Sequence, residues 1–173
     1  MDGIVHTLGG QALQHACRDA APVPIGSVAI TTSGELAALC GAKHVLHAVC
    51  PDGHSNGNIE AIYTSMIRLL LKMADTQGAR SLAVPALGTG VKDWNPKLAA
   101  KLMLNEIART TCSSASSLRE VTVVLPDARA WEAYNSVGRA GWGEPKPLQK
   151  SMMTKVKAGS NKRIEGVFWK QLV

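Results

Sequence analysis

Residues 81–91 read Ser81-Leu82-Ala83-Val84-Pro85-Ala86-Leu87-Gly88-Thr89-Gly90-Val91, an apolar run followed by a loop with two glycines. The apolar run has the composition of a strand that is covered on both faces. Gly88 and Gly90 let backbone N–H groups approach an anion, and Asn95-Pro96 then favours a helix start. Strand, glycine loop and helix in this order predict a seat for a phosphate group. Spacing alone also fits a loop whose glycines serve only tight packing.

The rest of the chain alternates strand and helix patterns. Strands are expected at 25–31, 43–49 and 121–125, and helices at 4–17, 59–74, from 96 and from 127, where Asp127 is the expected cap. The helix at 59–74 carries a wide apolar stripe that includes Tyr63 and predicts a core-facing helix, whereas Gly9 and Gly10 weaken the helix at 4–17. Strand, helix, strand order predicts right-handed crossovers and a largely parallel sheet with helices on both faces. Ligands of such sheets lie beyond the carboxyl ends of the strands. The loop at 86–92 and the loop near Pro126 are expected to emerge there.

Four separated stretches resemble one family, the macro domain, a module that binds ADP-ribose. In chain order they are Asp2-Gly3-Ile4-Val5-His6 with Cys17, Thr32-Ser33-Gly34-Glu35-Leu36, Ala42-Lys43-His44-Val45-Leu46-His47 with Pro51, and Pro85-Ala86-Leu87-Gly88-Thr89-Gly90-Val91. The resemblance covers residues 2–138. It implies a three-layer α/β/α fold with a mixed, largely parallel sheet. We therefore expect a macro-like domain at residues 1–142 and a basic linker or tail at 143–173.

The resemblance also implies contacts with the ligand. The residues expected to bind ADP-ribose are Gly3, Ile4, Ala86, Leu87, Gly88, Thr89, Gly90, Val91, Lys92 and Pro126. In family members that hydrolyse ADP-ribose conjugates, the aspartate matching Asp2 positions or activates water beside the distal ribose. Asp2 is therefore the expected catalytic residue, although an acid here also suits a helix N-terminus without any catalytic role. Lys92 is expected either to pair with a phosphate or to be a solvated loop lysine.

Two features depart from the family pattern. Macro domains usually begin with two more strands and a glycine run before the position of Asp2, and this sequence starts at Met1. The domain is therefore expected to be N-terminally incomplete, with sheet strands that lack partners and expose their edges. The family also commonly places an aromatic residue after the glycine loop, where this chain has Lys92, with Trp94 two places on.

Cysteine and histidine spacing predicts no metal site. Cys40, His44, His47 and Cys50 have ligand-type side chains at close spacing. In a strand, however, His44 and Cys50 lie roughly 20 Å apart and His47 points to the opposite face. The four cysteines, at 17, 40, 50 and 112, have no paired spacing, and we expect reduced core thiols. No cofactor is expected.

Charge is concentrated at the C-terminal end. Residues 143–173 hold seven Lys or Arg against two Asp or Glu, in a chain of net charge +6. Such a segment can contact polyanions through their phosphates, or it can be a plain solvated linker. The chain has no apolar run long enough to span a membrane, and we expect a cytoplasmic or nuclear protein.

Three functions remain open from the sequence. The first is a module that binds ADP-ribose or an ADP-ribosylated protein through the glycine loop. The second is an ADP-ribosyl hydrolase or deacylase in which Asp2 orients water. The third is a degenerate macro fold without ligand, acting as an interaction or nucleic-acid-contacting module. Fold alone does not decide among them.

Overall fold

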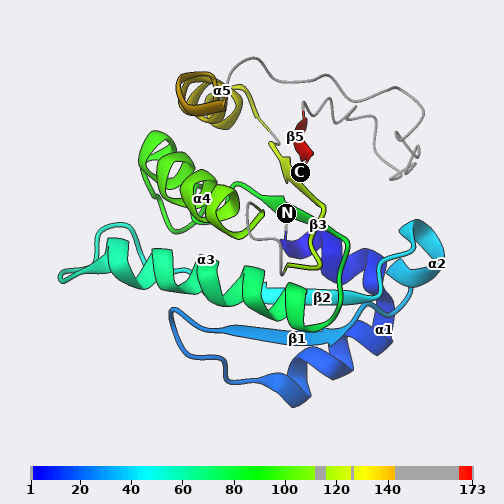
Figure 1. Ribbon diagram of the computed structural model, residues 1–173. Helices are drawn as coiled ribbons and strands as arrows, with labels where there is room; N and C mark the ends of the chain where they lie inside the picture. Colours follow the sequence, from blue (N-terminus) through cyan, green and yellow to red (C-terminus); the bar gives the residue numbers. More distant parts are fainter. Residues whose placement is uncertain (1, 112–115, 126, 143–167, 173) are drawn as a thin grey trace.

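The computed structural model describes residues 2–111, 116–125, 127–142 and 168–172 (Figure 1). The described helices are α1 (Asp2–Ala20), α2 (Leu36–Cys40), α3 (Ile59–Thr76), α4 (Pro96–Thr111) and α5 (Ala128–Trp142). The described strands are β1 (Val28–Thr32), β2 (His44–Ala48), β3 (Ser81–Pro85), β4 (Glu120–Val124) and β5 (Phe168–Leu172). None of the helices in these ranges is both long and apolar enough to cross a lipid bilayer.

The strands form two separate sets. β1 and β2 pair antiparallel, with Val28 opposite Ala48. β3 and β4 run parallel, with Ser81 opposite Glu120, and β5 adds antiparallel to β4. The pairing is mixed, as expected, but two of the three described pairs are antiparallel. Among the described strands β2 pairs only with β1 and β3 only with β4, so each keeps an edge without a strand partner.

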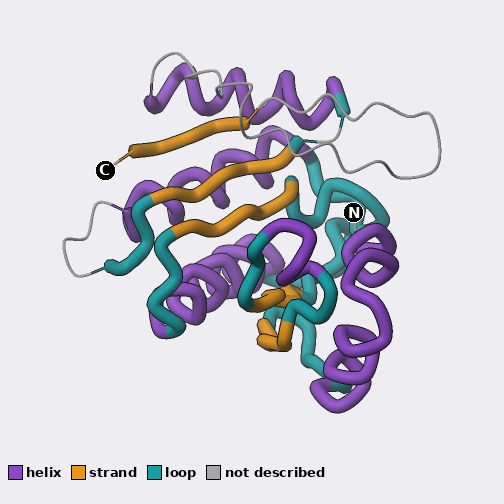
Figure 2. The backbone as a smooth tube through the Cα atoms, turned by 90° about the vertical axis from the view of Figure 1, so that its right-hand side faces the viewer, coloured by secondary structure: helices purple, strands orange, loops and turns teal. Residues whose placement is uncertain are grey.

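Helices flank both sets of strands. α1 and α3 lie on opposite sides of the β1–β2 pair (Figure 2), and α3 packs in turn against α4, which packs against α5. The strand, helix and layer pattern confirms the expected α/β/α arrangement. β5 lies within the segment expected to be a linker or tail, so this part of 143–173 joins the sheet.

The core lies where α3, α4 and α5 meet β3 and β4. The apolar stripe expected on the helix at 59–74 is buried, as its spacing predicts for a helix on a core. One charged group is also buried. Glu106 is 4% exposed and accepts hydrogen bonds from Arg68 at 2.8 and 3.0 Å and from Arg109 at 3.0 Å. Two guanidinium groups thus compensate one buried carboxylate, and that of Arg68 joins α3 to α4.

Side-chain caps fix where the later helices begin. The carboxamide oxygen of Asn95 accepts from the amide of Lys97 at 3.0 Å, so α4 begins where the sequence predicts. Asp127 accepts from the amide of Ala130 at 2.8 Å and caps α5 in the same way. These caps need only short-range contacts, which is why local sequence identifies them.

α1 is two helical pieces joined at Gly10. The backbone of Gly10 has φ 66° and ψ −166°, a conformation essentially restricted to glycine. A Cβ at this position would collide with the carboxylate of Glu35. The amide of Glu35 also donates to the carbonyl of Gly9 at 3.1 Å, which ties the bend to the turn before α2. The glycine pair that weakened the predicted helix therefore marks a sharp change of direction.

The cysteines do not all lie in the core. Cys50 is 7% exposed, as expected for a core thiol. Cys40 is exposed, so that expectation is wrong there. The reason is that Cys40 ends α2, a short helix with no buried residue. Cys112 lies outside the described residues.

Candidate functional site

The loop that follows β3 is closed by its own hydrogen bonds. Gly88 has φ 79°, and its carbonyl accepts from the amide of Trp94 at 3.1 Å. The amide of Asp93 donates to the carbonyl of Gly90 at 2.9 Å. The hydroxyl of Thr89 donates to the carbonyl of Ala86 at 2.8 Å, so its hydrogen is turned into the loop. Thr89 therefore helps to shape the loop and does not offer this proton to a ligand.

Two buried aromatic rings support the loop from beneath. Tyr63 from α3 is 0% exposed, and its hydroxyl donates to the carbonyl of Leu87 at 3.0 Å. Its ring centroid lies 4.4 Å from that of Trp94, which is 2% exposed. The indole N–H of Trp94 donates to the carbonyl of Pro51 at 2.9 Å. The polar atoms of both rings are hydrogen-bonded, and both rings bury a large area. Tyr63 and Trp94 therefore form a rigid floor beneath the loop.

The two glycines of the loop differ in what a Cβ at each position would meet. At Gly88 a Cβ would lie 2.9 Å from the Trp94 ring, and the positive φ disfavours other residues. This glycine is explained by packing alone. At Gly90 a Cβ would enter open space, with nothing within 4 Å. Internal packing therefore does not explain Gly90, and an external group approaching the backbone would.

Backbone amides line the outer side of the loop. Within the described part of the chain, no backbone acceptor takes the amides of Gly90 and Val91, and Val91 is 100% exposed. Successive amides of this kind can bind an anion without a charged side chain. The first amides of α4 contribute less than expected, since Lys97 and Leu98 donate to the cap Asn95. Among the described residues of this region, the amides without a backbone acceptor thus include those of Gly90 and Val91 in the loop itself.

Lys92 is half-buried and anchored by its backbone. Its carbonyl accepts from the amide of Gly53 at 2.8 Å. Burial raises the pKa of the Cys50 thiol to about 11, and the nearby Lys92 ammonium opposes this shift. The Lys92 ammonium therefore lies close enough to the buried Cys50 thiol to affect its pKa.

An exposed ion pair joins this loop to the loop after β2. His54 Nε2 lies 2.9 Å from a carboxylate oxygen of Asp93, and their side chains are 74% and 61% exposed. The hydrogen bond with Asp93 is the main reason why the pKa of His54 is raised, with a smaller effect of Asp52. Asp93 also has a positive φ of 47°, which Asp and Asn tolerate better than most residues.

The N-terminal side of the predicted site is only partly defined. Asp2 is the first residue of α1, but its side chain is not among those described, and Pro126 lies outside the described residues. Gly3 is exposed and Ile4 is 48% exposed. No hydrogen bond between described residues links these two positions to the loop at 86–92. Of the segments expected to contact ADP-ribose, the structure thus describes only the loop at 86–92 in detail.

Comparison with known proteins identifies the family of this chain. The family model described as "Macro domain" matches residues 1–103. The chain belongs to the macro domain family. A macro domain-containing protein of Streptomyces coelicolor is 34% identical over 140 residues, which is 78% of each chain. A second such protein, from Streptomyces nogalater, is 34% identical over 78% of this chain and 73% of its own.

Solved macrodomains share the fold. A macrodomain of Oceanobacillus iheyensis, solved with ADP, superposes with a TM-score of 0.72 at 24% identity, over 80% of this chain and 74% of its own. A mutant of the same macrodomain, solved with ADP-ribose, gives 0.71 at 23% identity, over 80% and 76%. A Trypanosoma brucei macrodomain in complex with ADP gives 0.68 at 21% identity, over 79% and 55%.

Sequence reasoning missed the support for the macro domain's loop. Tyr63 was expected only as one member of a core stripe, and Trp94 only as a neighbour of Lys92. Their contact spans 31 positions of the chain and has no signature in local spacing. The one usable signal was the presence of large aromatics beside a glycine loop, in a chain with few aromatics.

Proposed function

We propose that this macro domain binds ADP-ribose, free or attached to a protein, with the diphosphate held by the loop at 86–92. The observation that carries the proposal is the pair formed by Gly90 and Val91. Both are exposed, both amides lack a described backbone acceptor, and the glycine has no packing reason. An approaching phosphate would give these amides their hydrogen bonds.

The rigid floor strengthens the proposal. The hydrogen bonds from Tyr63 to Leu87 and from Trp94 to Pro51 hold the loop before any ligand arrives. A loop that is already ordered loses little conformational entropy on binding. ADP and ADP-ribose are the ligands named for the solved relatives, and both contain a diphosphate. The same fold with a preformed glycine loop therefore supports the same class of ligand here.

Isothermal titration of ADP-ribose into the 173-residue chain tests the proposal. The expected result is saturable binding to the wild type, and at least a tenfold weaker affinity for Gly90→Glu. The new carboxylate would fill the open space at Gly90 and repel a phosphate. Gly141→Glu is the matched control, since a Cβ at Gly141 on α5 also enters open space. Binding that is absent in the folded wild type, or equal in Gly90→Glu, would overturn the proposal.

Catalysis by Asp2 and nucleic-acid contact by residues 143–173 stay predictions. Incubation with an ADP-ribosylated protein would separate binding from turnover, because only a hydrolase releases ADP-ribose and loses this activity in Asp2→Asn. For the basic segment, removal of residues 146–163 should abolish any salt-sensitive affinity for RNA or DNA. Neither result would change the assignment of the glycine loop.

A further inference from the structure

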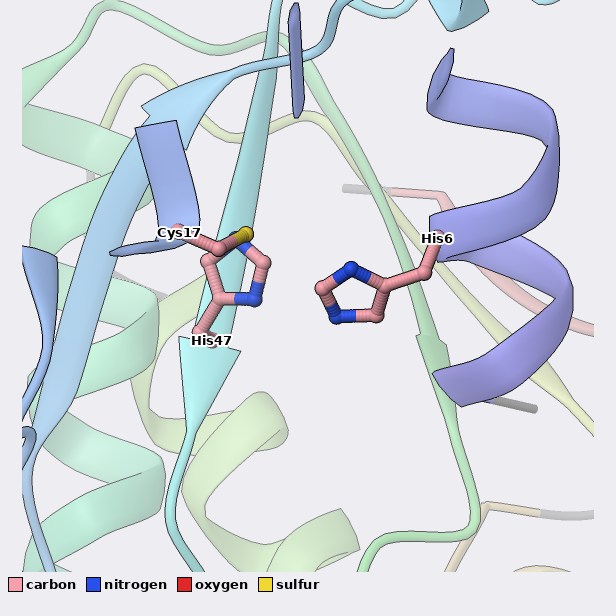
Figure 3. Close-up of side chains that lie close together, drawn as sticks. All are labelled: His6, Cys17 and His47. Carbon is pink, nitrogen blue, oxygen red and sulfur yellow. The ribbon is translucent and has the colours of Figure 1, made fainter. Parts of the chain in front are cut away.

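Three side chains with metal-binding atoms meet between α1 and β2. They are His6 and Cys17, from the two pieces of α1, and His47 from β2 (Figure 3). One ligand atom from each lies within 4.8 Å of the other two, and all three residues are partly buried. None of the three residues belongs to the glycine loop, and only His47 is also a member of the closely spaced set Cys40, His44, His47 and Cys50.

The bend in α1 is what allows the cluster to form. Positions 6 and 17 are eleven residues apart, which is about 16 Å along a straight helix. The non-helical backbone of Gly10 lies between them and redirects the chain. Figure 3 shows His6 on one helical piece and Cys17 on another, both near His47. A strained glycine thus brings two ligand-type residues of one helix to a single strand residue.

The spacing fits a tetrahedral metal ion. Cys17 Sγ lies 3.6 Å from His47 Nε2. With a Zn–S bond of about 2.3 Å and a Zn–N bond of about 2.0 Å, two ligands of a tetrahedral ion lie roughly 3.5 Å apart. The ligand atom of His6 lies within 4.8 Å of those of Cys17 and His47, so the His6 side chain has to turn toward them to complete the set.

We propose that His6, Cys17 and His47 bind one divalent transition-metal ion of the zinc class. Two imidazoles and one thiolate suit Zn²⁺ or Co²⁺ and disfavour Mg²⁺ and Ca²⁺, which prefer oxygen ligands. Water completes the coordination. None of the three ligands is a residue of the loop at 86–92, and the proposal does not depend on the function of that loop.

Metal binding at this cluster displaces protons. The Thr31 hydroxyl lies 2.9 Å from His47 Nε2, the nitrogen that also faces Cys17, so a metal ion bound there replaces this contact. On binding, the imidazoles coordinate as neutral rings, and the Cys17 thiol releases its proton to solvent. Two metal–nitrogen bonds and one metal–sulfur bond form, and about one proton is released for each ion bound.

The bound metal would connect both pieces of α1 to β2. The first piece carries Gly3 and Ile4, which have little burial to hold them. An ion that binds only the folded chain also stabilises it in proportion to its concentration. We therefore expect the melting temperature to rise with Zn²⁺ and to fall back on adding a chelator.

Cobalt spectroscopy on the tag-free, chelator-treated 173-residue chain tests the proposal. We expect one Co²⁺ per chain, a thiolate-to-cobalt charge-transfer band, and displacement of both by Zn²⁺. Cys17→Ser should remove the band, and His6→Gln should weaken binding by at least the 10–100-fold that loss of an outer partner costs. His6→Gln keeps the test decisive if Cys17→Ser fails to fold, because His6 is a partly exposed helix position that tolerates glutamine.

Each ligand has a matched control in the chain. Cys40 is an exposed cysteine on α2, His15 an exposed histidine on α1, and His44 an exposed histidine on the same strand as His47. Cys40→Ser, His15→Gln and His44→Gln should leave cobalt binding unchanged. A wild type without the charge-transfer band, or a band lost equally in Cys40→Ser, would show that the cluster is a hydrogen-bonded contact and not a metal site.

Discussion

The predicted ADP-ribose site has two walls, the loop at 86–92 and the first piece of α1 with Gly3 and Ile4, and the fold supports them in opposite ways. The loop after β3 rests on Tyr63 and Trp94, which are 0% and 2% exposed and bonded to carbonyls on either side of it. The first piece of α1 has exposed residues at Gly3 and Ile4, and its nearest fully buried side chain, Leu13, lies beyond the bend. The loop thus rests on core side chains, whereas the first piece of α1 is joined to the rest of its helix through Gly10.

This difference assigns different roles to the two walls. A loop fixed by core side chains presents its amides in one geometry, so the chain has already lost that conformational entropy. A segment with few buried contacts opens at low free-energy cost. We expect the loop to determine whether a diphosphate binds, and the first piece of α1 to determine how closely the rest of the ligand is enclosed.

The largest expected effect comes from removing the floor of the loop. Trp94→Ala should lower the free energy of unfolding by about 3–5 kcal/mol, the usual loss for a buried Trp or Phe. Because Trp94 also packs against the position of Gly88, affinity for ADP-ribose should fall as well. Urea unfolding and isothermal titration on the same variant measure both effects.

Trp131 on α5 provides the control for this loss. It is partly buried against the core, and no hydrogen bond or ring contact between described residues links it to the glycine loop. Trp131→Ala should also destabilise the fold while leaving the affinity for ADP-ribose unchanged, provided that the measurement is made below the unfolding transition. If both variants lost affinity equally, the loop would not depend on its own floor and the contrast between the two walls would fail.

The elements that the sequence predicts well are those with local causes. The apolar stripe at 59–74, the caps Asn95 and Asp127, and the glycine loop itself all follow from neighbouring residues. The floor of the loop does not, because Tyr63 and Trp94 meet only after the chain has folded. The orientation of the Thr89 hydroxyl depends on loop closure, which composition cannot show.

A smaller effect is expected at the bend of α1. Gly10→Ala should cost about 1–3 kcal/mol, because alanine does not tolerate this backbone conformation. Its Cβ would also collide with Glu35, which is exposed and can move. Urea unfolding measures the loss, and cobalt binding reports whether His6 still reaches Cys17.

Gly141→Ala is the matched substitution in an ordinary helix. It lies in α5 with open space around it, so alanine should be neutral or stabilise by up to about 1 kcal/mol. A similar gain in unfolding free energy in Gly10→Ala would mean that α1 can run straight through position 10. The bend would then not require glycine at that position.

The metal-type cluster shows most clearly what sequence spacing cannot reveal. His6 and Cys17 would be far apart on a straight helix, and His47 follows thirty residues after Cys17. The glycine pair at 9 and 10 signalled a weak helix, but not the direction of the bend. Of the four residues whose close spacing drew notice, Cys40, His44, His47 and Cys50, only His47 belongs to the ligand-type group found among the described residues.

The smallest expected effect is at the exposed pair that links the loop after β2 to the glycine loop. Asp93→Asn keeps a residue suited to the positive φ and removes the carboxylate whose hydrogen bond and charge raise the pKa of His54. NMR titration should therefore show a lower His54 pKa in this variant, and Asp52→Asn should lower it less.

Because the folded-state pKa of His54 is raised, the pair stabilises the fold at mildly acidic pH, and this contribution disappears as the pH rises through the folded-state pKa. The difference in unfolding free energy between wild type and Asp93→Asn should therefore shrink with rising pH, and it should be small throughout, because both side chains are mostly exposed. A difference that grew with pH would mean that Asp93 supports the glycine loop through its backbone geometry rather than through its charge.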